Sequence, residues 1–115
     1  MRRLGIVFAL LLVACGGPLA DAKTDFKKGH YAEAKSALLR AEAESRAWTD
    51  KQRAEYALYR GLTHGALGDR AAAALWLREA KAIEDTHPGT LAPDDMARLN
   101  LAFESNDPAQ LPASP

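Results

Sequence analysis

The stretch GHYAEAKSALLRA at residues 29–41 recurs as GDRAAAALWLREA at residues 68–80, and this repeat decides the fold. Each copy opens on a glycine, and the copies lie 39 residues apart, from Gly29 to Gly68. The alignment pairs Ala34 with Ala73, Leu38 with Leu77, and Ala41 with Ala80. Self-similarity at such a period is typical of arrays in which each helical unit buries its apolar face on its neighbour. We therefore expect an all-α fold, an antiparallel array of helical hairpins.

The composition around the repeat also favours helices. Residues 19–104 are rich in Ala, Leu, Glu, Lys and Arg, and Ile83 is the sole Val or Ile among them. Thr49 and Gln52 have the spacing of a capping box, and Pro93 suits the first turn of a helix. Gly, Pro, Asp and Thr residues separate five predicted helices, at 19–28, 31–46, 50–67, 70–85 and 93–104.

The two copies resemble the tetratricopeptide repeat, whose usual unit has about 34 residues. The matching positions are Gly29, Tyr31, Ala34, Leu38 and Ala41 in the first copy, and Gly61, Gly68, Ala73, Leu77 and Ala80 in the second. The second copy matches better. Gly61 and Ala73 would let the helices of one unit approach closely, and Gly68 would permit the turn between them. Leu77 would then fill the groove.

The resemblance predicts about two units followed by a cap. The first unit, at 19–48, is truncated, and the second spans 49–89, with residues 45–51 absorbing the extra length. Fewer than three full repeats leave an open apolar face. We expect a capping helix at 90–105, or a partner protein, to cover it; Leu99, Leu101 and Phe103 point to the helix. Residues 106–115 hold three prolines and are expected to form a disordered tail.

The start of the chain resembles a bacterial lipoprotein signal. Arg2 and Arg3 precede an apolar run at 4–14, and Leu12-Val13-Ala14-Cys15 matches all four positions of the lipobox. The resemblance implies that residues 1–14 are removed, that Cys15 carries diacylglyceryl and acyl groups, and that 15–18 form a short tether. As a helix the apolar run would extend only ~16 Å, against a hydrocarbon core of ~30 Å. An anchored protein is therefore expected, not one that spans the membrane.

Two other interpretations of this region remain open. The sequence Ala20-Asp21-Ala22 fits a signal-peptidase site, so the protein could be secreted without a lipid after cleavage at Ala22. Cys15 could also be a buried structural cysteine.

Gly16 follows the cysteine where an inner-membrane retention signal would carry Asp. The lipoprotein would therefore sit in the outer membrane of a bacterium that has one, with its domain facing the periplasm.

Charge and motif content exclude several functional classes. The full chain has 15 basic and 15 acidic residues, and loss of Arg2 and Arg3 leaves 13 against 15, a net charge of −2. This balance does not favour nucleic acid as a partner. No phosphate loop, nucleophile elbow or zinc motif occurs, so the protein is not expected to be an enzyme or to hold a metal or other cofactor. Three separated histidines remain: His30, His64 and His87; Arg60 stands one helical turn from His64, which argues against a ligand there.

The remaining candidates are side chains for binding a partner. Tyr56, Tyr59 and Trp76 are expected to pack in the core. Trp48, in the connection between units, is either a contact residue or a staple that holds the connection onto the helices. The candidate partner-binding residues are Leu58, Tyr59, Leu62 and Ala66 in an apolar groove, together with Trp48.

These features together predict a non-catalytic envelope adaptor. Its partner would be a peptide or helix of a protein in secretion, pilus, motility or outer-membrane assembly machinery. A small structural lipoprotein without a groove is the alternative. An enzyme or metal carrier is a third class with little in its favour.

Overall fold

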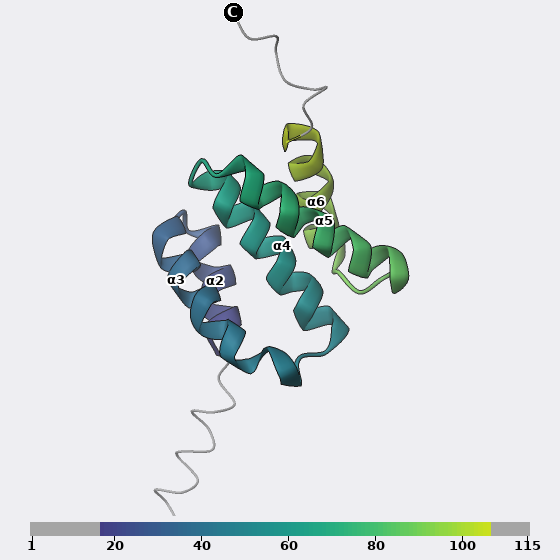
Figure 1. Cartoon of the computed structure of the whole chain (residues 1–115), viewed down its shortest axis with the longest axis horizontal. Coiled ribbons are helices and arrows are strands. Elements are labelled where there is room, and N and C mark those ends of the chain that lie inside the picture. The colour runs from purple at the N-terminus through teal and green to yellow at the C-terminus, as the bar shows by residue number, and fades with distance from the viewer. Residues whose placement is uncertain (1–16, 107–115) are drawn as a thin grey trace, which may run out of the picture.

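The computed structural model describes residues 17–106, and this part of the chain is an all-α array of helical hairpins without a strand (Figure 1). The helices are α2 (Pro18–Lys27), α3 (Tyr31–Ala41), the 3₁₀ helix η1 (Glu42–Ala47), α4 (Asp50–Ala66), α5 (Arg70–Thr86) and α6 (Pro93–Asn106). The predicted fold class is thereby confirmed. The lipobox residues Leu12, Val13, Ala14 and Cys15 and the tail after Asn106 lie outside the described residues. No helix among residues 17–106 is both long and apolar enough to cross a membrane.

One predicted helix was too long. The expected helix at 31–46 ends as an α-helix at Ala41, and η1 continues the chain to Ala47. Ala41 is fully buried, whereas η1 contains no buried residue. Since most helical stability in a protein comes from a packed apolar face, the regular α-helix stops where that face stops. The tighter 3₁₀ turns then lead the chain across to α4.

The glycine that opens each copy of the repeat ends a helix. Gly29 and Gly68 have φ angles of 81° and 89°, a left-handed conformation that glycine adopts without a steric penalty. The amide of Gly29 donates to the carbonyl of Phe26, and that of His30 donates to Asp25. Gly68 and Asp69 repeat this pattern with Gly65 and His64. Both are Schellman motifs, so the repeat in sequence is a repeat of one turn geometry.

The capping box at the start of α4 is present. The backbone amide of Gln52 donates to Oγ1 of Thr49 at 3.2 Å, and the amide of Thr49 donates to Oε1 of Gln52 at 2.9 Å. Two amides that the first helical turn leaves unpaired are satisfied in this way. The start of α4 is therefore set by two side chains that stand three residues apart.

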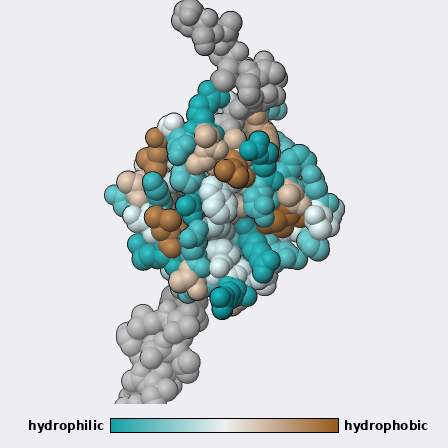
Figure 2. Space-filling model, in the orientation of Figure 1, coloured by the Kyte–Doolittle hydropathy of each residue, from teal (hydrophilic) through white to brown (hydrophobic). Residues whose placement is uncertain are grey.

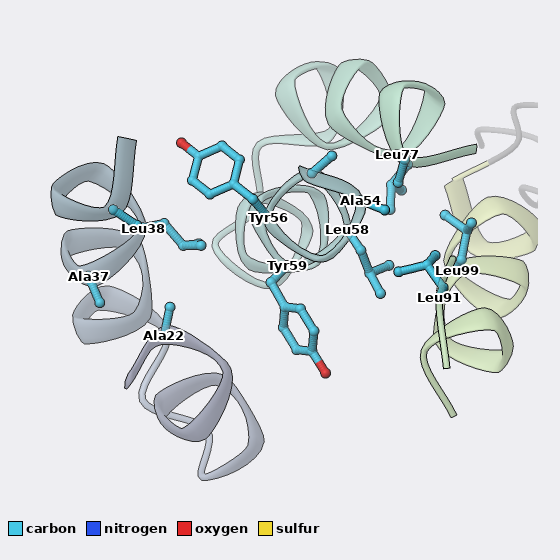
Figure 3. Packing of buried hydrophobic residues seen from close by; sticks show 13 residues of the cluster. Ala22, Ala37, Leu38, Ala54, Tyr56, Leu58, Tyr59, Leu77, Leu91 and Leu99 are labelled. Carbon is cyan, nitrogen blue, oxygen red and sulfur yellow. The ribbon is translucent and has the colours of Figure 1, made fainter. Parts of the chain in front are cut away.

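The core is built around α4, which has more buried residues than any other described helix. Figure 3 looks down this helix and shows that its side chains leave in several directions. Leu58 points toward Leu91 and Leu99, while Tyr56 and Tyr59 point to separate sides. α4 is thus enclosed by the α2–α3 hairpin, by α5 and by α6 (Figures 1 and 3).

The close approach of α4 and α5 is centred on Gly61 and Leu77. A Cβ atom on Gly61 would lie 2.8 Å from Cγ and Cδ2 of Leu77, so Leu77, and not Ala73, fills the space at Gly61. Ala73 instead faces Gly65, at 3.7 Å from the corresponding Cβ position. The α5 register places a large side chain at the crossing, because the missing side chain of Gly61 leaves room for it.

The last helix covers the open side of the array. Leu99 of α6 is 1% exposed, and the hydroxyl of Tyr59 donates to Oδ1 of Asp95 at 2.8 Å. Phe103 packs partly buried against the core. Leu101 does not belong to this contact, because its side chain is 63% exposed. Before α6, the carboxylate of Glu84 accepts hydrogen bonds from the amides of Gly89 and Leu91 and so fixes the connection.

Candidate functional site

A pocket of about 510 Å³ lies between η1, α4 and α5. The connection at Trp48 forms one wall, and the facing sides of α4 and α5 form the others. Its lining residues are Glu42, Ser45, Arg46, Trp48, Arg53, Tyr56, Ala57, Trp76, Glu79 and Ile83. Figure 2 shows that hydrophobic residues on the visible face are separate spots among polar ones, so this face has no broad apolar patch. The candidate site is therefore the pocket.

Helical spacing brings the lining side chains together. Arg53, Tyr56 and Ala57 stand at positions i, i+3 and i+4 of α4, which lie on one face of a helix. Trp76, Glu79 and Ile83 follow at i, i+3 and i+7 of α5. The capping box fixes the start of the first set, and the crossing of Gly61 with Leu77 holds the second set against it.

Three aromatic rings form a continuous row along the pocket. The ring centroids of Trp48 and Tyr56 are 4.8 Å apart with planes tilted by 41°. Those of Tyr56 and Trp76 are 5.5 Å apart and meet edge to face, at 86°. Such pairs stabilise one another by about 0.5–1.5 kcal/mol beyond their buried area. The three rings are therefore preorganised: their mutual contacts hold them in place without a bound partner.

Arg60 fixes one end of this row. Its Nη1 donates to Oε1 of Glu42 at 2.7 Å, and the Tyr56 hydroxyl donates to the same oxygen at 2.7 Å. The guanidinium carbon of Arg60 also lies 4.9 Å from the ring centroid of Trp76, a cation–π distance. η1, α4 and α5 are thus tied together by one arginine.

These contacts shift the protonation of the groups involved. The hydrogen bond from Tyr56, followed by the contacts with Arg60, lowers the pKa of Glu42 against the opposing effect of burial. Burial, and then the hydrogen bond to Glu42, raises the pKa of Tyr56. Glu42 is therefore a carboxylate at neutral pH and Tyr56 a neutral phenol, which is the pairing that the hydrogen bond requires.

His64 lies one turn beyond Arg60 and is held neutral. Nε of Arg60 donates to Nε2 of His64 at 3.1 Å, so that nitrogen is an acceptor. Burial, followed by the positive charge of Arg60, lowers the pKa of His64. Among residues 17–106, no three His, Cys, Asp or Glu side chains are grouped so that they could hold a metal ion.

One of the predicted partner-binding residues lies in the pocket. Trp48 is half-buried, lines the pocket and packs on Tyr56, so it is both a staple and an accessible wall. The predictions for Leu58 and Tyr59 were wrong, because both side chains are fully buried. Leu58 faces Leu91 and Leu99, and the hydroxyl of Tyr59 is bonded to Asp95 of α6.

The other two predicted groove residues lie elsewhere. Leu62 packs half-buried against the core, and Ala66 is exposed at the far end of α4. Neither of them lines the pocket. An apolar groove along this face of α4 does not form, because α6 covers it.

Sequence reasoning missed most of the pocket. Tyr56 and Trp76 were expected in the core, and Tyr56, 4% exposed, does belong to it, with Trp76 packed partly buried against it. Neither these two nor the charged residues of the pocket were expected to line a site. A signal was present in the spacing of Arg53, Tyr56 and Arg60, which puts two cations and an aromatic ring on one stripe. What the sequence could not indicate was that η1 would lie against this stripe.

The chemistry of the pocket is aromatic and electrically balanced. Arg46 and Arg53 oppose Glu42 and Glu79, and neither indole N–H of Trp48 and Trp76 donates to another group among residues 17–106. Such a surface can hold an apolar side chain and donate hydrogen bonds to the carbonyl groups beside it.

Comparison of the chain with protein-family models, curated proteins and solved structures finds no match.

Proposed function

We propose that this chain is a lipid-anchored lipoprotein of the bacterial cell envelope that acts as a non-catalytic adaptor. A segment of a partner protein binds in the pocket, with an apolar side chain against the rings of Trp48, Tyr56 and Trp76. The lipid is carried by Cys15, and the domain faces the periplasm, from the outer membrane where the organism has one.

The position of α2 supports cleavage and acylation at Cys15. α2 begins at Pro18, three residues after the cysteine, so removal of residues 1–14 leaves the whole helix in place. The alternative cleavage after Ala22 would remove the first half of α2. Ala22 itself is fully buried in the core, and Leu19 packs against it. Secretion without a lipid would therefore cost the fold part of its first hairpin.

The aromatic row is the observation that carries the adaptor role. Aromatic side chains and arginine supply most of the binding free energy at protein interfaces, because they bury much area and lose little conformational freedom. Here three rings and Arg60 are already held by mutual contacts, so little ordering is required when a partner binds. The resemblance to tetratricopeptide repeats favours the same class of function.

The partner is proposed to belong to secretion, pilus, motility or outer-membrane assembly machinery, as the lipoprotein and repeat resemblances imply. A photo-crosslinking amino acid at Ser45, which lines the pocket, tests this role in the living bacterium. The matched control places the same amino acid at Leu75, an exposed residue of α5 that does not line the pocket. We expect a discrete crosslinked protein from position 45 alone.

The substitution Trp76→Ala sharpens this experiment. It should abolish the crosslink from position 45 while the circular dichroism spectrum stays helical, since Trp76 is only half-buried. Equal crosslinking from positions 45 and 75, or a crosslink that survives Trp76→Ala, would favour a small structural lipoprotein without a binding pocket.

The anchor is tested separately. Labelled palmitate should enter the wild-type protein and not Cys15→Ser, and the variant should leave the membrane fraction. Labelling that persists in Cys15→Ser would contradict the proposed anchor.

A further inference from the structure

The start of the described chain lies directly beside η1. Glu44 of η1 is the neighbour of Gly17, with Oε2 3.7 Å from the position that a Cβ atom would take. Figure 1 likewise shows α2 beginning next to the end of α3 and η1. Only Gly16 separates Cys15 from Gly17, and the two steps of the chain between them span at most about 7 Å. A lipid on Cys15 therefore enters the membrane close to η1.

The antiparallel order of the helices gathers several helix ends here. α3 ends at η1, α4 begins two residues after Trp48, and His87 after α5 lies 3.4 Å from Asp50, between Nε2 and Oδ2. The hairpin turns at Gly29 and Gly68 belong to the opposite end, where Arg70 donates to the carbonyl of Ser105. The array thus has two chemically different ends, and one of them is tied to Cys15.

The residues at the tethered end suit a lipid headgroup layer. Trp48 is half-buried, and its indole N–H donates to no other described residue, so it is available to bond with lipid phosphate or carbonyl groups. Exposed Arg46, Lys51 and Arg53 stand beside Glu44 and Asp50, a nearly balanced set of charges. Contact of this end of the array with the membrane therefore depends on the lipid tether and on the Trp48 indole. Its nearly balanced charges give it little electrostatic attraction to anionic lipid.

We infer that, when Cys15 carries its lipid, the η1 edge of the array (residues 42–48 with Lys51) faces the bilayer, with the Trp48 ring among the lipid headgroups. The pocket then opens beside the membrane surface, and the partner approaches along that surface. This orientation rests on the proposed acylation of Cys15.

The two tryptophans of the chain allow a direct test. The lipidated protein is purified from membranes and reconstituted in phosphatidylcholine vesicles, with brominated lipid as a quencher of tryptophan emission. In Trp76→Phe, where Trp48 is the single tryptophan, emission should shift to shorter wavelength and be quenched. In Trp48→Phe, which retains Trp76, quenching should be weaker, and moderate salt should change neither result.

A second pair of variants reports the orientation without altering an aromatic residue. Ala43→Cys on η1 and Ala66→Cys at the far end of α4 are both exposed, and each adds one free thiol because Cys15 is blocked by its lipid. A nitroxide label at position 43 should lose accessibility to a water-soluble relaxation agent on the vesicles, and a label at position 66 should not.

The outcomes separate the orientation from the anchor. Equal quenching of the two tryptophan variants, or equal accessibility of the two labels, with lipid present on Cys15 by mass spectrometry, overturns the orientation alone. Protein that mass spectrometry shows to lack the lipid overturns the anchor and the orientation together.

Discussion

At the scale of single residues, two glycines on one helix show how local space sets the tolerance to substitution. A Cβ on Gly61 would lie 2.8 Å from Cγ of Leu77 and 3.1 Å from its backbone nitrogen. A Cβ on Gly65, one turn later, would lie 3.7 Å from Cβ of Ala73, an ordinary contact. The same residue type on the same helix is thus required at one position and replaceable at the other.

The first prediction concerns this pair. Gly61→Ala should lower the free energy of unfolding by about 1–3 kcal/mol, because the added methyl group forces α5 away from α4. Gly65→Ala should raise it by up to about 1 kcal/mol, because alanine favours the helix. Urea unfolding followed by circular dichroism measures both. A stabilised Gly61→Ala would show that the crossing at Leu77 is looser than described.

The second prediction uses the lowered pKa of His64. The unfolded chain, with an ordinary histidine pKa of 6.5, binds a proton before the folded chain does. Stability from neutral His64 is therefore complete above that value and is lost as the pH falls toward the folded pKa. The free energy of unfolding should drop as the pH falls through and below 6.5, and it should drop less in His64→Gln. If the free energy of unfolding depended on pH in the same way in the wild-type protein and in His64→Gln, the neutral state of His64 would be contradicted.

At the scale of elements, the array depends on where helices start and stop. Schellman turns at Gly29 and Gly68 end α2 and α4, and the capping box at Thr49 begins α4. η1 shows the opposite situation, since an α-helix gives way to 3₁₀ turns where burial ends. These local interactions fix where α2, α4 and η1 begin or end, and the tertiary contacts then decide which helix faces form the pocket.

The third prediction tests the capping box. Thr49→Ala should lower the free energy of unfolding by about 1 kcal/mol, because the backbone amide of Gln52 loses its acceptor, Oγ1 of Thr49. Thr49→Ser keeps the hydroxyl and serves as the matched control. Its free energy of unfolding should fall by a few tenths of a kcal/mol at most. Denaturant midpoints at constant slope measure the difference. An equal loss in both variants would mean that the threonine methyl group, and not the hydrogen bond, stabilises the start of α4.

At the scale of the whole molecule, α6 supplies the burial that a short array lacks. It covers the side of α4 that carries Leu58 and Tyr59, and it contributes buried Leu99 and Asp95. Because the face is covered, the described array needs no further unit on that side. α6 leaves open the pocket between η1, α4 and α5.

The fourth prediction concerns this cover. Leu99→Ala should cost about 2–5 kcal/mol of stability because it leaves a cavity in the core. Leu101→Ala, on the same helix but exposed, should change stability by less than about 0.5 kcal/mol. Thermal melting of a chain that ends before Pro93 should give a lower midpoint than that of the full mature domain. An unchanged midpoint would remove the capping role of α6.

Much of the fold was predictable because its signals are local. Four of the five predicted helices match the structure within two residues at each end, since Gly, Pro and the Thr49 capping box act through backbone geometry near them. The length of the helix from Tyr31 was not predictable in this way. Its end depends on burial against α4, which is distant in sequence.

The candidate site was far less predictable. Because of its place in a connection, Trp48 was predicted to be either a contact residue or a staple, and it both lines the pocket and packs on Tyr56. Leu58 and Tyr59 were assigned to a groove that does not form, because α6 covers that face. Their apolar character is equally compatible with a core and with a binding surface. Only the packing of α6 distinguishes the two, and that packing involves residues about 40 positions away.

The sequence by itself determined that the described chain is helical, where the hairpins turn, and which residues repeat, because these properties depend on neighbours within about one helical turn. Tertiary structure alone decided which faces of the helices stay open. η1, α4 and α5 meet at the Trp48–Tyr56–Trp76 row because Leu77 fits the space at Gly61 and Arg60 reaches Glu42. Contacts of this kind join distant parts of the chain, so no local pattern specifies them.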